Sequence, residues 1–524
     1  MTTCPALRCL LCLALVPGVD ARAQRARLGS VSFPTSAGPA AQAEFVTGVL
    51  WLHSFEYDRA ANAFRNAQRL EPGFVLAYWG EAMTHTHPVW NEQDPTSGRE
   101  VLGRLGPSTA VRLARAPTRR EGLYLEAVEA LYGEGSKARR DTLYAHAMER
   151  LVREHPEDHE AKAFYALALL GQNQGVRDTT TYLRSAPYAD TVFRANRSHP
   201  GAAHYLIHAY DDPFHARLGL EAARAYSGIA PDAPHAQHMT THIFLALGMW
   251  EEVVSQNRIA LHHAPRAPGH YSSWLHYGLL QQGRIGEATQ LLVRLGGDLP
   301  RTAGQGPHTY RSVMRASHLL HAKEWRGGPA EWQLPHDRMA PAGQAVDAYL
   351  RGAIAFRRRN GGILAAAGAE VALLAARVEA DALGAGGPEV RQVRVMAREL
   401  GAMLLFLNGS RDGAVRVMRE ATILEDAIPL EFGPPVIVEP SHELLGTMLL
   451  EMDPKAAQLE FEKALVLAPG RALALEGLVR ASVAAGDRDT ARRALDSLST
   501  VWREADPRIR DDLEVLRRTV SRMR

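Results

Sequence analysis

Two stretches near opposite ends of the chain share one pattern of residues. Residues 60–72 have the sequence AANAFRNAQRLEP, and residues 457–469 have the sequence AQLEFEKALVLAP. Each begins with alanine, has phenylalanine four positions later, a second alanine three positions after that, and proline after five more. Small residues let a neighbouring helix come close, phenylalanine fills the remaining space, and proline ends a helix. The pattern therefore predicts a packed pair of helices at each end of the chain.

Between these stretches the same pattern recurs in looser form. From residue 41 onward apolar residues recur every three or four positions, β-branched runs are few, and no convincing alternating strand appears, which predicts helices almost everywhere. Such internal repetition predicts a helical solenoid, with an unrelated all-α bundle as the alternative. Looser copies of the pattern lie at residues 144–156, 192–200, 223–231, 409–421 and 475–495.

The spacing resembles the tetratricopeptide repeat, a helix–turn–helix unit of about 34 residues. The resemblance covers most of residues 41–500 and is most specific at the two ends. It implies an all-α fold, a right-handed superhelix of helical hairpins, whose concave groove binds a protein or peptide segment. We predict an N-terminal array at 41–340, with a histidine-rich middle, and a C-terminal array at 341–524.

Three stretches are expected to interrupt the arrays. Residues 84–118 contain scattered proline and glycine and predict an extended loop plus a short helix. Residues 296–343 also cluster glycine and proline, which is why the module boundary is placed near residue 340. The segment Pro429–Pro440, which contains Gly433-Pro434-Pro435, predicts an ordered crossover between two helices.

The N-terminus has the order of a secretory signal. Arg8 precedes the apolar run Cys9–Val16, and Ala21-Arg22-Ala23 matches a cleavage site between small residues. We predict a signal peptide at 1–23, a flexible lead-in at 24–40, and a periplasmic or secreted protein.

Two alternatives to a cleaved signal are a lipoprotein signal and a retained signal anchor. The lipoprotein alternative is weak because Leu11, before Cys12, is larger than such a signal requires. All three cysteines lie in the first 23 residues, so a cleaved chain forms no disulfide and no thiolate metal site.

The composition excludes several classes of protein. The 524 residues are 46% hydrophobic and 23% charged, which excludes a disordered chain and a polytopic membrane protein. With 60 basic and 58 acidic residues the net charge is +2, which gives no attraction to nucleic acid. No nucleic-acid partner is predicted, and no membrane span after signal cleavage.

Histidine is the residue that indicates chemistry. Eleven of the 22 histidines lie between His199 and His276. His204 and His208 are four residues apart, and His235, His238 and His242 follow at spacings of three and four, so each set lies on one face of a helix. The helix that carries the second set is predicted to run from Asp232 to Gly248. A neutral imidazole, which a helix N-terminus favours, is the form that binds a metal. The predicted ligands are His235, His238 and His242, followed by His204 and His208.

Carboxylates follow the first of these helices. Asp211 and Asp212 come directly after the histidine pair and could orient a ligand or act as a base. Imidazole and carboxylate without thiolate suit zinc, iron, copper or manganese, and an open coordination position would make the site catalytic.

Two other interpretations of these residues remain open. Polar and aromatic residues of the same region could line a ligand groove without metal, or the histidines could be hydrogen-bonded core groups. No zincin, phosphate-loop or nucleophile-elbow motif is present, so no catalytic residue is predicted and enzymatic activity is undecided. A peptide-binding scaffold is the first expectation and a metal-binding protein the second. The predicted groove residues are Glu81, His85, His87, Tyr205, Tyr271 and His276.

Overall fold

The structure is a computed structural model that describes residues 26–523, except 175, 263–266, 298, 301 and 382–387. The predicted signal peptide lies outside these residues. The described chain is a solenoid of helical hairpins, as the sequence predicts, in which nearly every helix packs against the next along the chain. Its N-terminal helices are α1 (Pro39–His53), α2 (Tyr57–Leu70), α3 (Val75–Met83), α4 (Pro95–Leu105), α5 (Thr109–Leu113), α6 (Arg119–Leu131), α7 (Lys137–Glu154), α8 (His159–Leu170), α9 (Thr179–Ala195), α10 (Pro200–Ala209), α11 (Ala216–Ile229), α12 (Pro234–Ala246) and α13 (Trp250–His262).

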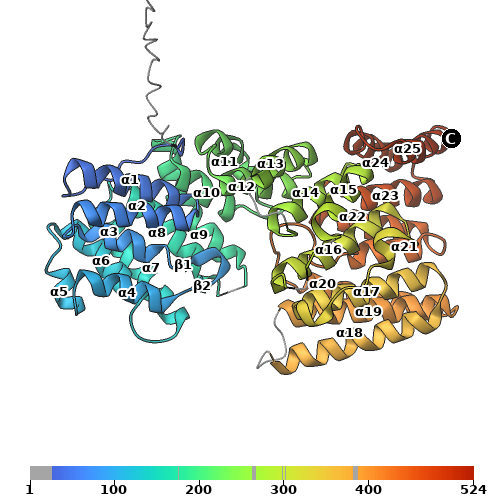
Figure 1. Cartoon of the computed structure of the whole chain (residues 1–524). Helices are drawn as coiled ribbons and strands as arrows, with labels where there is room; N and C mark the ends of the chain where they lie inside the picture. Colours follow the sequence, from blue (N-terminus) through green and yellow to red (C-terminus); the bar gives the residue numbers. More distant parts are fainter. Residues whose placement is uncertain are drawn as a thin grey trace, which may run out of the picture.

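The second half of the array is also helical. Figure 1 shows two groups of helices, with α12 and α13 between them. Short 3-10 turns are η1 (Pro88–Trp90), η2 (Gly171–Asn173), η3 (Gly328–Glu331) and η4 (His336–Arg338). The remaining helices are α14 (His270–Gln281), α15 (Ile285–Gly296), α16 (Gln305–Ala322), α17 (Pro341–Arg357), α18 (Gly361–Asp381), α19 (Pro388–Leu407), α20 (Arg411–Asp426), α21 (Ser441–Leu449), α22 (Pro454–Leu467), α23 (Ala472–Ala485), α24 (Arg488–Val501) and α25 (Pro507–Ser521).

The two matching sequence stretches pack in the same way. Phe64 of α2 lies between two glycines, and a Cβ atom would come within 2.6 Å of its ring at Gly48 and within 2.4 Å at Gly80. Near the other end, Phe461 of α22 lies between Gly446 and Gly477, with corresponding distances of 3.0 and 2.2 Å. Only glycine leaves room for the ring at these contacts, so the repeat pattern records a real packing requirement.

Two of the predicted interruptions are mostly helical. Residues 84–118 were expected to form an extended loop plus one short helix, and they contain a short hairpin, β1 (Thr86–His87) with β2 (Glu92–Gln93), followed by two helices, α4 and α5. Pro95 occupies the first turn of α4, where its missing N–H costs nothing, and Asp94 caps the helix. The glycine- and proline-rich stretch 296–343 similarly contains the 18-residue helix α16.

Residues 26–38, which belong to the expected lead-in, lie against the array. Leu28 and Phe33 are buried, and the Ser30 amide donates to the Ser198 carbonyl oxygen at 2.9 Å. Asp232, the predicted N-cap of α12, instead pairs with Arg27 at 3.0 Å, and the helix starts two residues later.

The C-terminal helices turn back to the middle of the chain. The Trp250 indole donates to the Gly470 carbonyl oxygen at 2.8 Å. The buried Arg471 guanidinium donates to the Tyr277 hydroxyl at 2.8 Å and pairs with Glu443 at 2.7 Å. The start of α23 is therefore fixed against α13 and α14, and Figure 1 shows the last helices next to α15.

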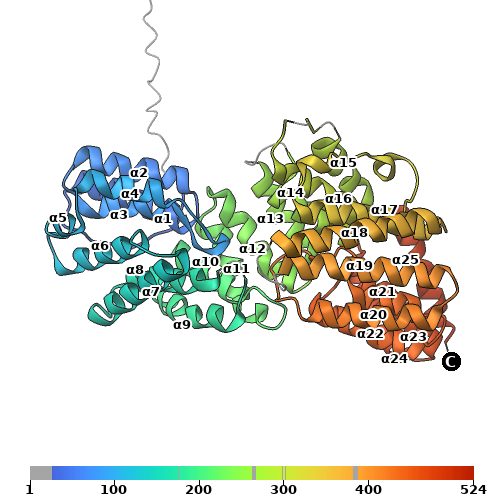
Figure 2. The ribbon, with the colours of Figure 1, turned by 90° about the horizontal axis from the view of Figure 1, so that it is seen from below.

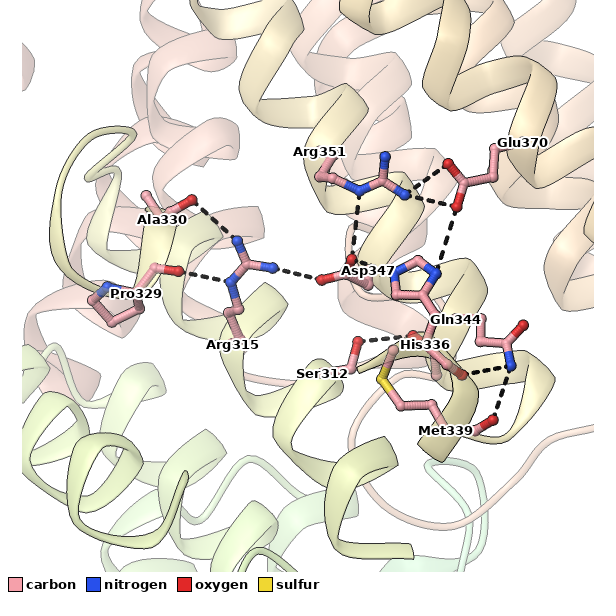
Figure 3. A network of polar contacts seen from close by, with 11 residues as sticks. Ser312, Arg315, Pro329, Ala330, His336, Met339, Gln344, Asp347, Arg351 and Glu370 are labelled. Atoms are coloured by element: carbon pink, nitrogen blue, oxygen red, sulfur yellow. Dashed lines mark hydrogen bonds and ion pairs between the residues drawn. The ribbon is translucent and has the colours of Figure 1, made fainter. Parts of the chain in front are cut away.

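A polar network joins α16 to α17 across the predicted boundary near residue 340. Asp347 accepts from Arg315 at 2.5 Å and from His336 at 2.8 Å, and it lies 3.4 Å from Arg351 (Figure 3). Arg315 also donates to the Pro329 carbonyl oxygen at 2.7 Å, which ties the intervening loop to both helices.

Among the described helices, one is long and apolar enough to cross a membrane. This segment is Gly361–Ala380 of α18, and 28% of its most apolar 18-residue window is buried. It packs between α17 and α19 in the C-terminal array (Figure 2).

Candidate metal centre

The five predicted histidine ligands lie on two neighbouring helices, α10 and α12. All five side chains are buried. Helix α12 is buried nearly all round, because α10, α11 and α13 pack against it. A helix whose polar side chains are enclosed in this way must give each of them a partner or a ligand.

The structure separates these histidines into two adjacent groups of three. The first triad is His204, His208 and His235; the second triad is His238, His242 and His270. In each triad one ring nitrogen per residue lies within 4.8 Å of the other two. From the sequence, His235, His238 and His242 of α12 were expected to meet at a single point. In the structure His235 instead joins His204 and His208 of α10, and His270 of α14 joins His238 and His242.

In the first triad four of the six ring nitrogens have no hydrogen-bond partner among the described residues. His204 Nδ1 donates to the His53 carbonyl oxygen at 2.7 Å, which leaves Nε2 with a lone pair. Among the described residues, His204 Nε2, both nitrogens of His208 and His235 Nε2 have no partner. Burial lowers the pKa of His204 to about 3 and the pKa values of His208 and His235 well below the usual value. These are neutral imidazoles with free lone pairs, as metal ligands must be.

In the second triad hydrogen bonds fix the tautomers. His242 Nδ1 donates to the Asp211 carboxylate at 2.5 Å, and His238 Nδ1 donates to Asn257 Oδ1 at 2.8 Å. The Asn257 amide nitrogen donates to the Val253 carbonyl oxygen at 2.9 Å, so the amide oxygen is the atom that faces His238. Both Nε2 atoms therefore carry lone pairs, and they face each other at 3.1 Å.

Two lone pairs at this distance repel unless a proton or a metal cation lies between them. Nitrogens bonded to one metal at about 2.0–2.1 Å are roughly 3.0–3.4 Å apart for bond angles near 90–110°. The separation of 3.1 Å falls in that range. Asp211 takes the place, behind His242, of the carboxylate that commonly orients a metal-bound histidine.

His270 completes the second triad from the first residue of α14. Its ring centroid lies 4.4 Å from that of His238, and its side chain is partly exposed. Burial lowers the pKa of His270 to about 3, so this imidazole is neutral near pH 7. The sequence placed His270 in the following helical pair but gave no spacing signal that linked it to α12.

The two triads lie side by side. The ring centroids of His208 and His242 are 5.9 Å apart, and those of His235 and His238 are 6.3 Å apart. Paired metals in dinuclear sites are about 3.5–4 Å apart, which rings at this separation can accommodate. The structure thus places two groups of three imidazoles side by side.

Aromatic side chains enclose this centre. Phe55 lies 4.2 Å from His204 and 5.5 Å from His235 between ring centroids, and its backbone has a φ of 55°. Trp274 lies 4.4 Å from His242, and Phe432 lies 5.2 Å from it. A left-handed backbone is unfavourable for phenylalanine, and strain of this kind gathers at functional sites.

A third buried group, His53, Glu160 and His199, has a different character. Glu160 accepts from His53 at 2.9 Å and from His199 at 3.0 Å, and the other ring nitrogens bond Tyr205 and the Ala202 amide. Burial opposes the charged carboxylate, but the two histidines lower the pKa of Glu160 to about 2. Every ring nitrogen is satisfied, so this is a buried hydrogen-bonded network that holds the His53 backbone behind His204.

Other predicted site residues lie around the centre or away from it. Asp212 pairs with Arg177 at 3.0 Å and does not contact either triad. Tyr271 lies 3.4 Å from His235 Nδ1. Tyr205 is fully buried against His53, and His276 is buried beside His318.

The remaining predicted groove residues lie near the first hairpins. Glu81 is buried and paired with Arg65 at 3.2 Å and with Arg104. His85 and His87 line an open cavity of about 780 Å³. Tyr205, His276 and Glu81 therefore pack between helices and not in an open groove, because inward positions of stacked hairpins are the most enclosed.

No family model matches the sequence, and no curated protein matches it significantly. Several solved structures are distantly similar. The human IFIT1 dimer with m7Gppp-AAAA is 13% identical, over 93% of this chain and 90% of that one, with a TM-score of 0.35. Yeast Tom70 is 12% identical, over 92% and 95%, with a TM-score of 0.28.

The Cut9–Hcn1 tetramer of the APC/C is 11% identical, over 91% of this chain and 89% of that one, with a TM-score of 0.34. Scores of this size say nothing about function, and the fold assignment depends on the helix packing described above. On that packing, the chain is a helical solenoid of tetratricopeptide-like hairpins.

Proposed function

We propose that this protein binds a pair of transition-metal ions, one at each histidine triad. The observation that carries the proposal is the approach of His238 Nε2 and His242 Nε2 to 3.1 Å, with both opposite nitrogens engaged as donors. The uncompensated nitrogens of the first triad support it independently. A structural role alone would leave several buried imidazole nitrogens unsatisfied, which is unfavourable.

Copper is the metal that this ligand set favours. All six ligands are imidazoles, which suit copper, zinc, iron and nickel, while the absence of ligating carboxylates disfavours manganese. Among divalent ions copper binds most tightly to a given nitrogen site. Because the imidazole ligands are neutral, they do not cancel the charge of a buried metal ion. A monovalent copper ion therefore costs less to desolvate than a divalent ion in the same site.

The test is the metal content of protein purified without a histidine tag or a metal column. The protein is incubated with copper, free ions are removed, and the bound metal is measured by elemental mass spectrometry. We expect about two equivalents of copper per chain. His208→Ala and His238→Ala should each remove about one equivalent. His276→Ala is the matched control, because His276 is equally buried and lies outside both triads.

Equal metal loss in all three variants, or no metal in the wild type, would contradict the proposal. Two equivalents of zinc, with copper excluded in competition, would keep the centre and reject its assignment to copper.

Export is also part of the proposal. The charged, apolar and cleavable order of residues 1–23 supports a periplasmic or secreted location. Intact-mass measurement of the exported protein should give a cysteine-free chain that starts at Gln24. Recovery of the full-length chain from the cytoplasm would contradict this location.

A second candidate function is the binding of a basic peptide at the cavity lined by His85 and His87. The specific observation is its wall, which contains Glu56, Asp58, Glu92 and Asp94 against Arg59 and Arg65. We expect Glu92→Lys to weaken binding of an arginine-rich peptide without changing metal content. Unchanged peptide binding in this variant would reject the candidate.

A further inference from the structure

The segment between α20 and α21 crosses to the metal centre from far along the sequence. Its Phe432 ring contacts both triads, 5.2 Å from His242 and 6.4 Å from His208 between ring centroids. The next residue, Gly433, has a φ of +102°, and a Cβ atom there would lie 2.6 Å from the Trp274 ring. Only glycine fits this position, so the backbone itself is packed against the aromatic wall of the centre.

Behind this segment lies a cavity of about 140 Å³. Phe432 and Asp211 belong both to its wall and to the surroundings of His242, so one layer of side chains separates the cavity from the second triad. Most of the wall is apolar. The apolar residues include Leu245, Ala246, Trp250, Ile428, Leu430 and Val436.

The size and walls of the cavity select a small ring. An apolar cavity of about 150 Å³ in another protein holds benzene, so this volume suits one aromatic ring. The apolar residues of the wall favour an uncharged ring over a strongly hydrated ligand, and its carboxylate residues disfavour an anion.

One polar group is available at the wall. Asp211 is engaged by His242, Asp212 by Arg177, and Glu425 by the Ser441 amide. His442 is engaged by Glu460 and Asp426, and the Tyr277 hydroxyl by Arg471. Glu431 is half-buried, and within the part of the chain that the structure describes its carboxyl group makes no hydrogen bond. A hydroxyl group on the ring would meet this carboxyl group.

We propose that the cavity binds a small phenol beside the metal centre, with its ring among the apolar residues and its hydroxyl bonded to Glu431. The placement beside a metal depends on the proposed function, but the binding of the phenol itself does not. This assigns an aromatic substrate class to the centre.

The experiment is a calorimetric titration of the full chain with phenol and with benzene, in metal-free and metal-loaded protein. We expect saturable binding of phenol in both forms, at about one equivalent, and weaker binding of benzene. Glu431→Leu should reduce the affinity for phenol about tenfold, to that for benzene, because it removes one hydrogen bond to a charged group.

Two cavity-filling variants complete the test. Ala246→Leu fills the cavity from α12 and Leu430→Trp fills it from the crossing segment, so a folding defect in one leaves the other informative. Each should lower phenol affinity at least tenfold while the protein keeps the wild-type metal content. Phenol binding that survives both substitutions, or that shows no saturation, overturns the assignment. If the wild-type protein takes up no metal and still binds phenol in this pattern, the metal proposal is rejected and the cavity assignment stands.

Discussion

His238 and His242 project their Nε2 atoms to within 3.1 Å of each other, while the Nδ1 atom of each donates a hydrogen bond on the far side. One turn of α12 sets this pair, and Asp211 and Asn257 fix its tautomers. In a bound site of this kind each histidine offers the lone pair of one ring nitrogen to the metal and donates a hydrogen bond from the other ring nitrogen.

Replacement of Asp211 by asparagine should weaken metal binding at the second triad by about 10- to 100-fold, because it removes the charge that orients and polarises His242. The affinity can be measured by competition with a chelator of known strength. Asp212→Asn is the matched control, since Asp212 is equally buried but pairs with Arg177. Equal weakening by both variants would show a general effect of packing and not of the ligand.

Replacement of Phe432 by alanine should speed the removal of metal by a chelator, because its ring covers both triads. Equilibrium metal content should change little, since no ligand is lost. Phe356→Ala serves as the control, because Phe356 lies against Phe406 in the C-terminal array. An unchanged extraction rate in Phe432→Ala would mean that the crossing segment does not control access.

The network around Asp347 predicts a particular pH dependence of stability. The hydrogen bond to Asp347 raises the pKa of His336. Burial opposes the charge of Asp347, but the His336 hydrogen bond and the Arg315 charge lower its pKa overall.

Stability from the raised histidine is complete below about pH 6.5 and is lost as pH rises, whereas stability from the lowered carboxylate is present above about pH 4 and is lost as pH falls. The difference in unfolding free energy between wild type and His336→Gln should therefore be largest between these values. Urea titrations at pH 5.5 and pH 8.5 measure it. A larger difference at pH 8.5 would contradict the assignment.

The two glycine-flanked phenylalanines predict local effects in the solenoid. Phe461→Ala should cost about 3–5 kcal/mol locally, because it leaves a cavity between helices. Hydrogen exchange should increase around residues 440–500 and hardly change around residues 45–75, since stacked repeats are coupled mainly to their neighbours. Phe64→Ala should give the reverse pattern. A uniform increase along the chain in either variant would contradict a solenoid.

The fold was predictable because its signal is local. The spacing around Phe64 and Phe461 depends on residues within one hairpin, and the structure confirms the packing that this spacing predicts. At residues 84–118, where an extended loop plus a short helix was expected, the structure has two helices, because Pro95 occupies a helix start and does not prevent α4 from forming.

The candidate site was only partly predictable. The helical spacing of the histidines placed them on shared faces, but spacing along one helix does not show which neighbour completes each triad. His270 and Asn257 arrive from other helices, and Phe432 arrives from about 190 residues further along the chain than His242. These contacts depend on how the C-terminal helices turn back, for which the sequence contains no local signal.

An anomalous-difference map from crystals of copper-loaded protein, with data collected on both sides of the copper absorption edge, tests the two-metal site most directly. We expect two copper peaks about 3.5–4 Å apart, one within about 2.1 Å of ring nitrogens in each triad. A single peak elsewhere, or no peak at either triad in protein that has been saturated with copper, would contradict it.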